Sequence, residues 1–161
     1  MQASFEIRLA APQDMPALLP LFRNYQDHYG QLTVAGEAQT QAFLADHLRH
    51  GDHGFVLLAW SGRIAVGFAS VYLTASGLLA ERLAHLGDLY VVPEQRRRGV
   101  GRALFDAVSA EARQRGIRLV RWLSLGSNVE LNRWYNRLVN SAGNFELFLR
   151  PTDGGTPPGA H

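Results

Sequence analysis

Apolar and polar residues along the chain follow two periodicities, and each periodicity predicts a different element. Alternation of apolar and polar residues, or a short apolar run bounded by Gly or Pro, predicts a strand. Apolar residues that recur every three or four positions predict a helix. The predicted strands are residues 4–10, 55–60, 63–74, 83–92, 117–125 and 145–149. The predicted helices are residues 12–30, 37–50, 99–115 and 128–139.

The order of these elements, β-α-α-β-β-β-α-β-α-β, predicts a mixed α/β domain. Ser61 and Gly62 form a turn signal between two strand patterns, so the front of the sheet is expected to be antiparallel. Residues 83–125 have the pattern of a strand, a helix and a second strand, which is a βαβ unit. We therefore expect a single domain over residues 1–150, followed by a flexible Pro/Gly-rich tail at 151–161.

The composition narrows the classes of protein to consider. With 161 residues, of which 47% are hydrophobic and 19% charged, the chain is long enough to bury a core. It has no cysteine, which excludes a disulfide scaffold, a thiolate metal site and a cysteine nucleophile. No apolar run approaches the ~20 residues that span a bilayer, and the first residues lack the pattern of a signal peptide. We therefore expect a cytoplasmic protein without a membrane partner.

Charge is divided unequally along the chain, and every basic residue is Arg. Residues 1–95 carry 5 Arg and 9 acidic residues, a net charge of −4. Residues 96–161 carry 11 Arg and 5 acidic residues, a net charge of +6. Most of these charges, taken one by one, are expected to be solvated surface. As a distribution, they favour cationic partners for the first part and anionic partners for the second.

The stretch from Val91 to Leu104 carries the most chemistry. A strand ends at Pro93, three consecutive Arg and two Gly follow, and a helix begins. The first N–H groups of a helix lack intrahelical acceptors and the helix dipole favours negative charge, so this loop predicts a pyrophosphate cradle. The lack of Lys excludes a P-loop, and Leu104 stands where a dinucleotide fingerprint needs its third Gly. The Arg run alone also fits a solvated loop or a nucleic-acid patch.

The spacing Arg96-x-x-Gly99-x-Gly101, between a predicted strand and a predicted helix, resembles the Q/R-x-x-G-x-G/A motif of the GNAT superfamily of acyl-CoA-dependent N-acetyltransferases. Asn128 and Tyr135, seven residues apart in the next predicted helix, resemble that family's later motif. This resemblance implies the GNAT acyltransferase fold, an α+β mixed sheet of about six to seven strands with four helices. It also implies acetyl transfer from acetyl-CoA to a primary amine, without a metal.

The resemblance further implies which residues bind acetyl-CoA. The backbone at Leu89, Tyr90 and Val91 would run along the pantetheine arm, where a bulge or splay would leave an N–H facing the thioester oxygen. Asn128 and Leu131 would bind the same arm. The residues implied for the pyrophosphate are Arg96, Arg97, Arg98, Gly99, Val100, Gly101 and Arg102.

Three residues are candidates for proton transfer. The resemblance implies that Tyr135 is the general acid, two helical turns beyond Asn128 on the same helix face; packing in the core is the alternative. Asp88 is a candidate base, because a carboxylate within an apolar strand is costly to bury without a partner. His85, with an ordinary pKa near 6.5, is the other candidate base or a satisfied strand residue. Strand alternation predicts that His85 and Asp88 lie on opposite faces.

The acceptor is expected to be a small cationic amine, such as a diamine, a polyamine or an amino-acid-like molecule. Asp27 and Asp88 belong to the acidic part of the chain and would bind it. Val139 and Asn140 stand where the family has a Gly-Phe pair, so the sequence departs from the family at the acceptor edge.

Two other functions fit parts of the sequence. An acyl-CoA-binding sensor without turnover would keep the cradle and lose the acid and base, yet Tyr135 and Asp88 are both present. A nucleic-acid binder would need a wider basic face, yet residues 1–95 are net negative. We therefore expect a small-molecule amine as partner, no nucleic acid, and a homodimer.

Overall fold

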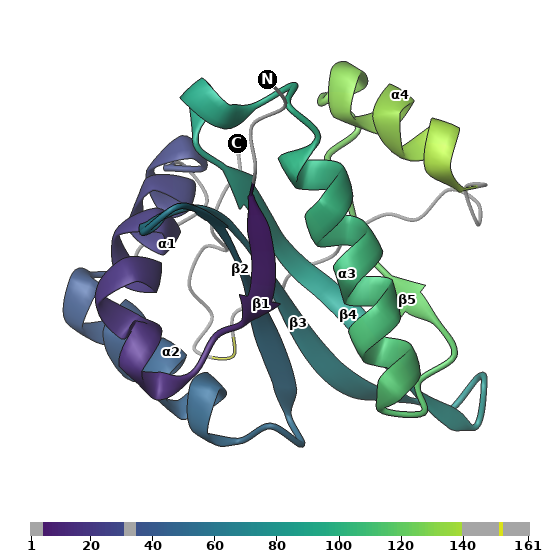
Figure 1. The fold of residues 1–161 in the computed structure, drawn as a ribbon. Coiled ribbons are helices and arrows are strands. Elements are labelled where there is room, and N and C mark those ends of the chain that lie inside the picture. Colours follow the sequence, from purple (N-terminus) through teal and green to yellow (C-terminus); the bar gives the residue numbers. More distant parts are fainter. Residues whose placement is uncertain (1–4, 31–34, 140–151, 153–161) are drawn as a thin grey trace. The chain divides into compact units, whose positions relative to one another are not determined.

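A computed structural model describes residues 5–30, 35–139 and 152 (Figure 1). The chain divides into two compact units, Met1–Trp122 and Leu123–His161. The second unit contains α4 (Val129–Leu138). The first unit contains, in order, β1 (Glu6–Leu9), η1 (Pro12–Asp14), α1 (Met15–His28), α2 (Glu37–Arg49), β2 (Gly54–Ser61), β3 (Ile64–Ser76), β4 (Glu81–Val91), η2 (Pro93–Gln95), α3 (Val100–Gln114) and β5 (Val120–Arg121). The expectation of a single domain over 1–150 stays a prediction.

The first unit is built on one sheet with the strand order β1-β2-β3-β4-β5. The first four strands pair antiparallel, and β4 pairs parallel with β5. The predicted hairpin is confirmed, because Ser61 pairs with Ile64 across a turn in which Gly62 has a φ of 60°. The mixed α+β fold is therefore confirmed, with five strands in the described part of the chain rather than six to seven.

The strand predicted over residues 117–125 is wrong in its extent. Only Val120–Arg121 forms a strand, and it pairs with two residues of β4. Apolar alternation indicates which side chains share a face, but it does not supply the hydrogen-bonding partner that a strand requires. The strand predicted at 145–149 and the tail predicted at 151–161 lie outside the described residues, apart from Thr152.

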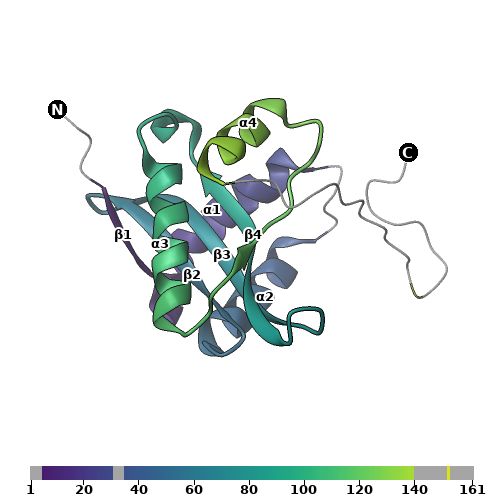
Figure 2. The ribbon, with the colours of Figure 1, turned by 90° about the vertical axis from the view of Figure 1, so that its right-hand side faces the viewer.

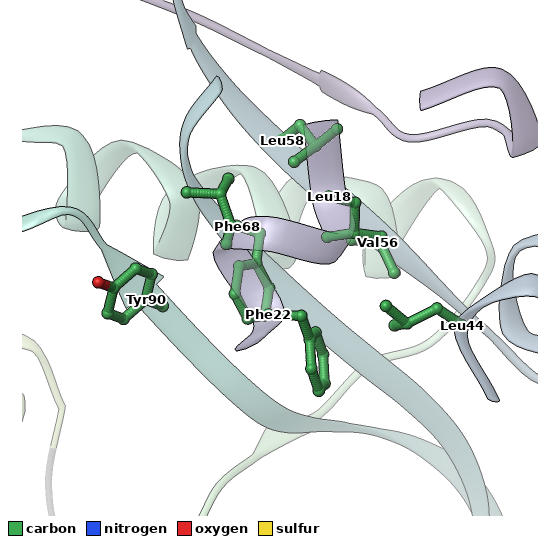
Figure 3. Close-up of a cluster of buried hydrophobic side chains, with 8 residues drawn as sticks. Leu18, Phe22, Leu44, Val56, Leu58, Phe68 and Tyr90 are labelled. Atoms are coloured by element: carbon green, nitrogen blue, oxygen red, sulfur yellow. The ribbon is translucent and has the colours of Figure 1, made fainter. Parts of the chain in front are cut away.

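Helices cover both faces of the sheet. In both views α1 and α2 lie against one face and α3 lies against the other (Figures 1 and 2). On the α1/α2 face, Phe22 stacks on Phe68 with ring centroids 5.0 Å apart. Each buried side chain of this size stabilises the fold by about 1.5–3 kcal/mol, so this cluster fixes α1 against β3 and β4. Its members are Leu18, Leu21, Phe22, Leu44, Val56, Leu58, Phe68 and Tyr90 (Figure 3).

The helix of the βαβ unit, α3, begins and ends at glycines, as predicted. Gly99 precedes it, and Gly116 follows it with a φ of 75°. The Gly116 N–H donates to the carbonyl of Arg113 at 3.0 Å, and the Ile117 N–H donates to that of Ala112 at 2.9 Å. This pair of bonds satisfies carbonyls that the last turn leaves without partners and directs the chain toward β5. The buried stripe of α3 consists of Val100, Leu104, Phe105, Val108 and Ala112.

The second unit confirms the helix predicted over 128–139. The side-chain oxygen of Asn128 accepts a hydrogen bond from the Leu131 N–H at 3.3 Å, so Asn128 caps α4. The side chain of Asn132 donates to the carbonyl of Leu125 at 2.9 Å, which fixes the chain before the helix. Within the described ranges, no helix has both the length and the apolar character needed to cross a membrane.

Candidate active site

The loop between β4 and α3 is shaped by two residues with positive φ. Arg97 has a φ of 60° and Gly99 a φ of 87°. Gly99 is the N-cap of α3, and Val100 after it is only 1% exposed, which anchors the start of the helix. Among the described residues no side chain caps this end, so its N–H groups remain available for an anion. All residues predicted for the pyrophosphate lie here: Arg96, Arg97, Arg98, Gly99, Val100, Gly101 and Arg102.

The two glycines of the motif leave room next to this helix end. A Cβ at Gly99 would meet no atom of the described chain within 4 Å. A Cβ at Gly101 would make only an ordinary contact of 3.9 Å with Cγ2 of Val91. Backbone conformation explains Gly99, but packing does not require Gly at position 101. The open space at both positions would let a ligand approach the backbone closely, as the predicted pyrophosphate site requires.

Two of the Arg side chains predicted for the pyrophosphate, one in this loop and one in the first turn of α3, are oriented by the protein itself. Arg96 donates through Nε to the carbonyl of Val91 at 2.8 Å, and its guanidinium lies 5.7 Å from the ring centre of Tyr90. Arg102 donates through Nε to both carboxylate oxygens of Asp106, at 2.8 and 3.0 Å. Exposed ion pairs of this kind contribute little to stability, so Arg102 can exchange Asp106 for a phosphate at low cost.

β4 and β5 separate just before this loop. Their parallel ladder ends at the pair His85–Arg121, so residues 86–91 of β4 have no strand partner on that side within the described part of the chain. The predicted pantetheine-binding backbone, residues 89–91, lies within this open edge. An unpaired strand edge presents N–H and C=O groups to an extended ligand, which supports that prediction.

Asp88 is the centre of a hydrogen-bonded cluster on the α1/α2 face of the sheet. Tyr72 of β3 donates its hydroxyl proton to Oδ2 of Asp88 at 2.8 Å. Ser70, two residues earlier on β3, donates to the Tyr72 hydroxyl at 3.1 Å. Tyr25 of α1 lies near enough to Asp88 to stabilise its charged form. The carboxylate therefore faces two phenols that come from distant parts of the sequence, of which Tyr72 makes the direct hydrogen bond.

A β-bulge interrupts β4 beside this cluster. Ser70 pairs with Asp88, whereas the next residue of β3, Val71, pairs with Leu86. Gly87 is therefore an extra residue on β4. A bulge bends the strand and increases its twist, and this one lies where the β4–β5 ladder has just ended.

The bulge also changes the side of the sheet on which His85 lies. His85 pairs with Tyr72, and Asp88 pairs with Ser70, which is two residues from Tyr72 on β3. Residues two apart on a regular strand share a face, and residues paired directly across two strands share it as well. His85 and Asp88 therefore lie on the same face. The prediction of opposite faces is wrong, because simple alternation does not allow for the extra residue.

Burial and neighbouring charge set the proton affinities in the cluster. Desolvation raises the pKa of Asp88 above the ordinary carboxyl range, while the hydrogen bonds from Tyr72 and Tyr25 oppose that rise. Burial, followed by the charge of Asp88, raises the pKa of both phenols. Burial lowers the pKa of His85, and the charge of Arg121 adds to this effect. At neutral pH the phenols are thus donors, His85 is neutral, and Asp88 is a stronger proton acceptor than an exposed carboxylate.

Asp27, the other acidic residue predicted to bind the acceptor, is not brought to this cluster. It is exposed on α1, two residues after Tyr25. Two residues rotate a helix by about 200°, so Asp27 lies on the side away from Tyr25. Tyr25 itself packs against Phe68 of the sheet, with ring centroids 5.8 Å apart. Binding of an acceptor by Asp27 stays a prediction.

Three predicted site residues belong to the second unit. Asn128 and Leu131 form the cap of α4, which occupies the side-chain oxygen of Asn128 but not its amide nitrogen. Tyr135 lies in α4, with its ring centroid 5.0 Å from that of Trp134. The contacts of these residues with acetyl-CoA, and the role of Tyr135 as acid, stay predictions.

Sequence reasoning missed the residues that surround Asp88. Tyr25 belongs to the apolar stripe of a predicted helix, and Ser70 and Tyr72 to a predicted strand, so none of them stood out. Alternation places Ser70 and Tyr72 on one face, but only the register with β4 shows that Asp88 lies opposite. An isolated Gly87 within a strand pattern was the available signal, because such a glycine often marks a bulge.

Comparison with known proteins gives the family. The sequence profile of the Acetyltransferase (GNAT) family matches residues 18–139. The chain is 34% identical over 110 residues to "Uncharacterized N-acetyltransferase YhfO" of Bacillus subtilis (strain 168), covering 68% of this chain and 72% of that protein.

Solved structures agree with this assignment. A crystal structure of a probable acetyltransferase superposes with a TM-score of 0.78 at 25% identity, covering 91% of this chain and 97% of that one. The aminoglycoside N-acetyltransferase AAC(6')-Iy in complex with CoA shares the fold, with a TM-score of 0.80 at 19% identity and coverage of 92% and 95%. The chain therefore belongs to the GNAT acetyltransferase family and is an acetyl-CoA-dependent N-acetyltransferase.

Proposed function

We propose that this enzyme acetylates a primary amine of a small cationic molecule, with Asp88 as the general base. The observation that carries the proposal is the half-buried carboxylate of Asp88, held on the sheet face by Tyr25 and Tyr72. Its hydrogen-bond partners among the described residues are hydroxyl groups and carry no positive charge. A carboxylate in such a setting attracts a cation.

The position of Asp88 along β4 supports this role. It lies three positions before Val91 at the end of the strand, roughly 10 Å away, and the cradle follows after η2. Acetyl-CoA, bound by residues 96–102 and along the open edge of β4, supplies the acetyl thioester. The proposed base, Asp88, and the backbone that would bind the acetyl thioester would then be close together on β4.

The reaction needs one group that accepts a proton and one that donates a proton, and each candidate residue fits one of these roles. An alkylammonium ion with a pKa near 10 must lose a proton before the amine can attack. Burial raises the pKa of Asp88, which makes it a better acceptor for that proton. His85, neutral and on the same face, is the second candidate base. Tyr135 donates the proton that the leaving thiolate needs, as the family resemblance implies.

Diamines, polyamines and amino-acid-like amines are the acceptor classes we propose. The structural neighbour AAC(6')-Iy is named for an amine-bearing small molecule, the aminoglycosides, which agrees with this size class. The negative net charge of residues 1–95, which supply α1, α2 and most of the sheet, agrees with a cationic acceptor.

A turnover screen tests the proposal. Release of free CoA thiol is measured with cationic amines, neutral arylamines, acidic amino acids and a lysine-containing peptide. Cationic small amines are expected to give the highest kcat/KM. A screen won by acidic amino acids or neutral arylamines contradicts the proposal, and one won by the peptide assigns a protein acceptor instead. A cytoplasmic location and a homodimer also stay predictions, the second checked by sedimentation velocity.

A further inference from the structure

The ring of Tyr72 lies directly over Gly87. A Cβ at position 87 would come within 2.4 Å of Cε2 and 2.9 Å of Cδ2 of Tyr72. Real Cβ atoms do not approach other atoms so closely. Glycine at the bulge is therefore the residue that allows the Tyr72 ring to occupy this place.

The other side of the Tyr72 ring is also held. His47 of α2, only 6% exposed, lies 4.8 Å from it between ring centroids, at an interplanar angle of 31°. Phe43, one helical turn earlier, lies 6.2 Å away. The ring is thus enclosed between α2 and the bulge of β4, and its hydroxyl has little freedom to move from Asp88.

The hydrogen bonds fix the direction in which Tyr72 donates. A phenol has one proton, and Ser70 donates to the Tyr72 oxygen at 3.1 Å, so that oxygen is an acceptor toward Ser70. The proton of Tyr72 is then committed to Asp88 at 2.8 Å. Ser70 has no exposed surface, so water does not replace it as the donor.

We propose that Tyr72 is a positioning residue, which orients the Asp88 carboxylate and favours its charged form, and that Gly87 is the residue that lets Tyr72 do so. This inference rests on the proposed role of Asp88 as base. A donor to a carboxylate stabilises the charged state, so Tyr72 keeps Asp88 able to accept a proton at a lower pH than burial alone would allow.

Other groups also act on Asp88, and the test must separate them. Tyr25 acts on Asp88 from α1, and His85 faces Asp88 from β4 itself. Arg121 of β5 acts on His85. Ser70 acts on Asp88 as well and loses its acceptor when the Tyr72 hydroxyl is removed. The other three side chains are kept in a substitution at Tyr72, so its effect on the titration of Asp88 reports the Tyr72 hydroxyl together with its Ser70 donor.

The first experiment removes only that hydroxyl. In Tyr72→Phe the ring and its packing remain, and the carboxyl resonance of Asp88, assigned through Asp88→Asn, is titrated by ¹³C NMR in the protein without ligands. Loss of one charge-assisted hydrogen bond is expected to move this titration, and the acid limb of the kcat/KM profile, to higher pH by about one unit. Tyr29→Phe keeps the ring that packs against Tyr25 at 5.2 Å and removes a phenol that is not among the groups acting on Asp88; it is the matched control and is expected to move neither.

The second experiment changes Gly87. Gly87→Ala is expected to displace the ring and to give a shift similar to that of Tyr72→Phe, and the double variant is expected to shift no further than either single variant. Gly77→Ala, where a Cβ would meet nothing, is the control. Shifts that add in the double variant, or a titration of Asp88 that Tyr72→Phe leaves unmoved, would overturn the inference. Because the NMR titration needs no turnover, absence of activity toward every amine refutes the proposed function separately.

A different cluster, at the end of α2, carries an independent inference. One ligand atom from each of Asp46, His50 and His53 lies within 4.8 Å of the other two, and all three side chains are exposed. Nδ1 of His50 lies 3.0 Å from the carbonyl oxygen of Asp46, one helical turn earlier, and 3.2 Å from Oδ1 of the same residue, which leaves Nε2 of His50 to bind a metal. The His50 and His53 rings lie 5.2 Å apart between centroids.

The backbone holds this cluster together. The His53 N–H donates to the His50 carbonyl at 2.8 Å, and the Leu73 N–H of β3 donates to the His53 carbonyl at 2.8 Å. The C-terminal end of a helix favours a positive charge. Two imidazoles and a carboxylate suit Zn²⁺ and its neighbours among the transition metals better than Mg²⁺ or Ca²⁺. We infer that Asp46, His50 and His53 form a binding site for a divalent transition metal.

Calorimetric titration of the full chain with Zn²⁺ alone tests this site. One saturable Zn²⁺ per chain is expected, and His50→Ala and His53→Ala are each expected to weaken it at least about tenfold. His28→Ala, an exposed histidine at the end of α1, is the matched control and should bind as the parent does. Binding that does not saturate, or equal affinity in all variants, would overturn the inference.

Discussion

The cradle at residues 96–102 and the cluster around Asp88 lie next to each other along one strand, yet they are built on opposite principles. The cradle is exposed, comes from one continuous stretch, and offers backbone N–H groups. The Asp88 cluster is largely buried, draws side chains from α1, β3 and β4, and depends on strand register. The cradle would bind acetyl-CoA, which all members of the family share. The Asp88 cluster would bind the acceptor, which differs among them.

This difference bears on how each region tolerates change. A backbone site keeps its donors when side chains are substituted, provided that the glycines and the helix start are kept. A side-chain site loses its chemistry when one member is replaced, because a buried polar group is then left without its partner. We therefore expect large effects at Asp88 from a change of a single atom, and large effects at the cradle only from added bulk or charge.

The largest expected effect is a loss of catalysis without a loss of CoA binding. Asp88→Asn should lower kcat/KM for a cationic amine roughly 10²- to 10⁴-fold, the usual loss for a general base. It should also flatten the acid limb of the pH profile, because the raised pKa of Asp88 sets where the free enzyme gains its base as pH rises. CoA affinity, measured by calorimetry, should stay unchanged. Asp52→Asn, an exposed carboxylate, is the control; an Asp88→Asn enzyme with unaltered kinetics would make His85 the base.

A substitution in the cradle is expected to weaken CoA binding instead. Gly99→Glu should weaken CoA binding at least about 10²-fold, because it places a like charge where the pyrophosphate approaches. The φ of 87° strains any side chain at this position, so Gly99→Ala, which adds the strain without the charge, is the matched control. Circular dichroism checks that both variants fold. Equal CoA affinity in the two variants would contradict the cradle assignment.

A smaller effect is expected at Tyr135, in the second unit. Tyr135→Phe should lower kcat about 10²-fold with little change in CoA affinity, as loss of a general acid does. Steady-state kinetics with acetyl-CoA and a cationic amine measure this. If kcat does not change, Tyr135 only packs, and another group protonates the thiolate.

The smallest expected effect concerns stability rather than rate. Folding raises the pKa of Asp88, so its charged form costs stability above the folded-state pKa, and this cost vanishes at acid pH, where both states are protonated. Asp88→Asn should therefore raise Tm at neutral pH and leave it nearly unchanged at acid pH, because only the charged form of Asp88 carries the cost of burial. Thermal melts at neutral and acid pH check this. A Tm that falls at neutral pH would mean that the phenols stabilise the charged form of Asp88 by more than its burial destabilises it.

The sequence predicted the strand end, the loop and the helix start at residues 91–102 better than it predicted the surroundings of Asp88. Every feature of the cradle, from Arg96 to Gly101, is local, and local rules for helix starts identify it. The hairpin around Gly62 was equally local. The face of His85 was predicted wrongly and Tyr72 was missed, because both depend on how β3 and β4 are aligned. Alignment of strands is a long-range property, and one extra residue alters it.

That extra residue, Gly87, lies between the carboxylate proposed to bind the amine and the last residues of β4 that pair with β5. The β4–β5 ladder ends at His85, two residues before Gly87, and the bulge at Gly87 bends the strand beyond that point. A chain that lacked this residue would keep the pair of Asp88 with Ser70 but would lose the bend in β4. We expect such a chain to keep its carboxylate and to present a differently shaped strand edge to acetyl-CoA. A one-residue deletion within this strand would thus weaken one proposed substrate site while the residues of the other stay in place.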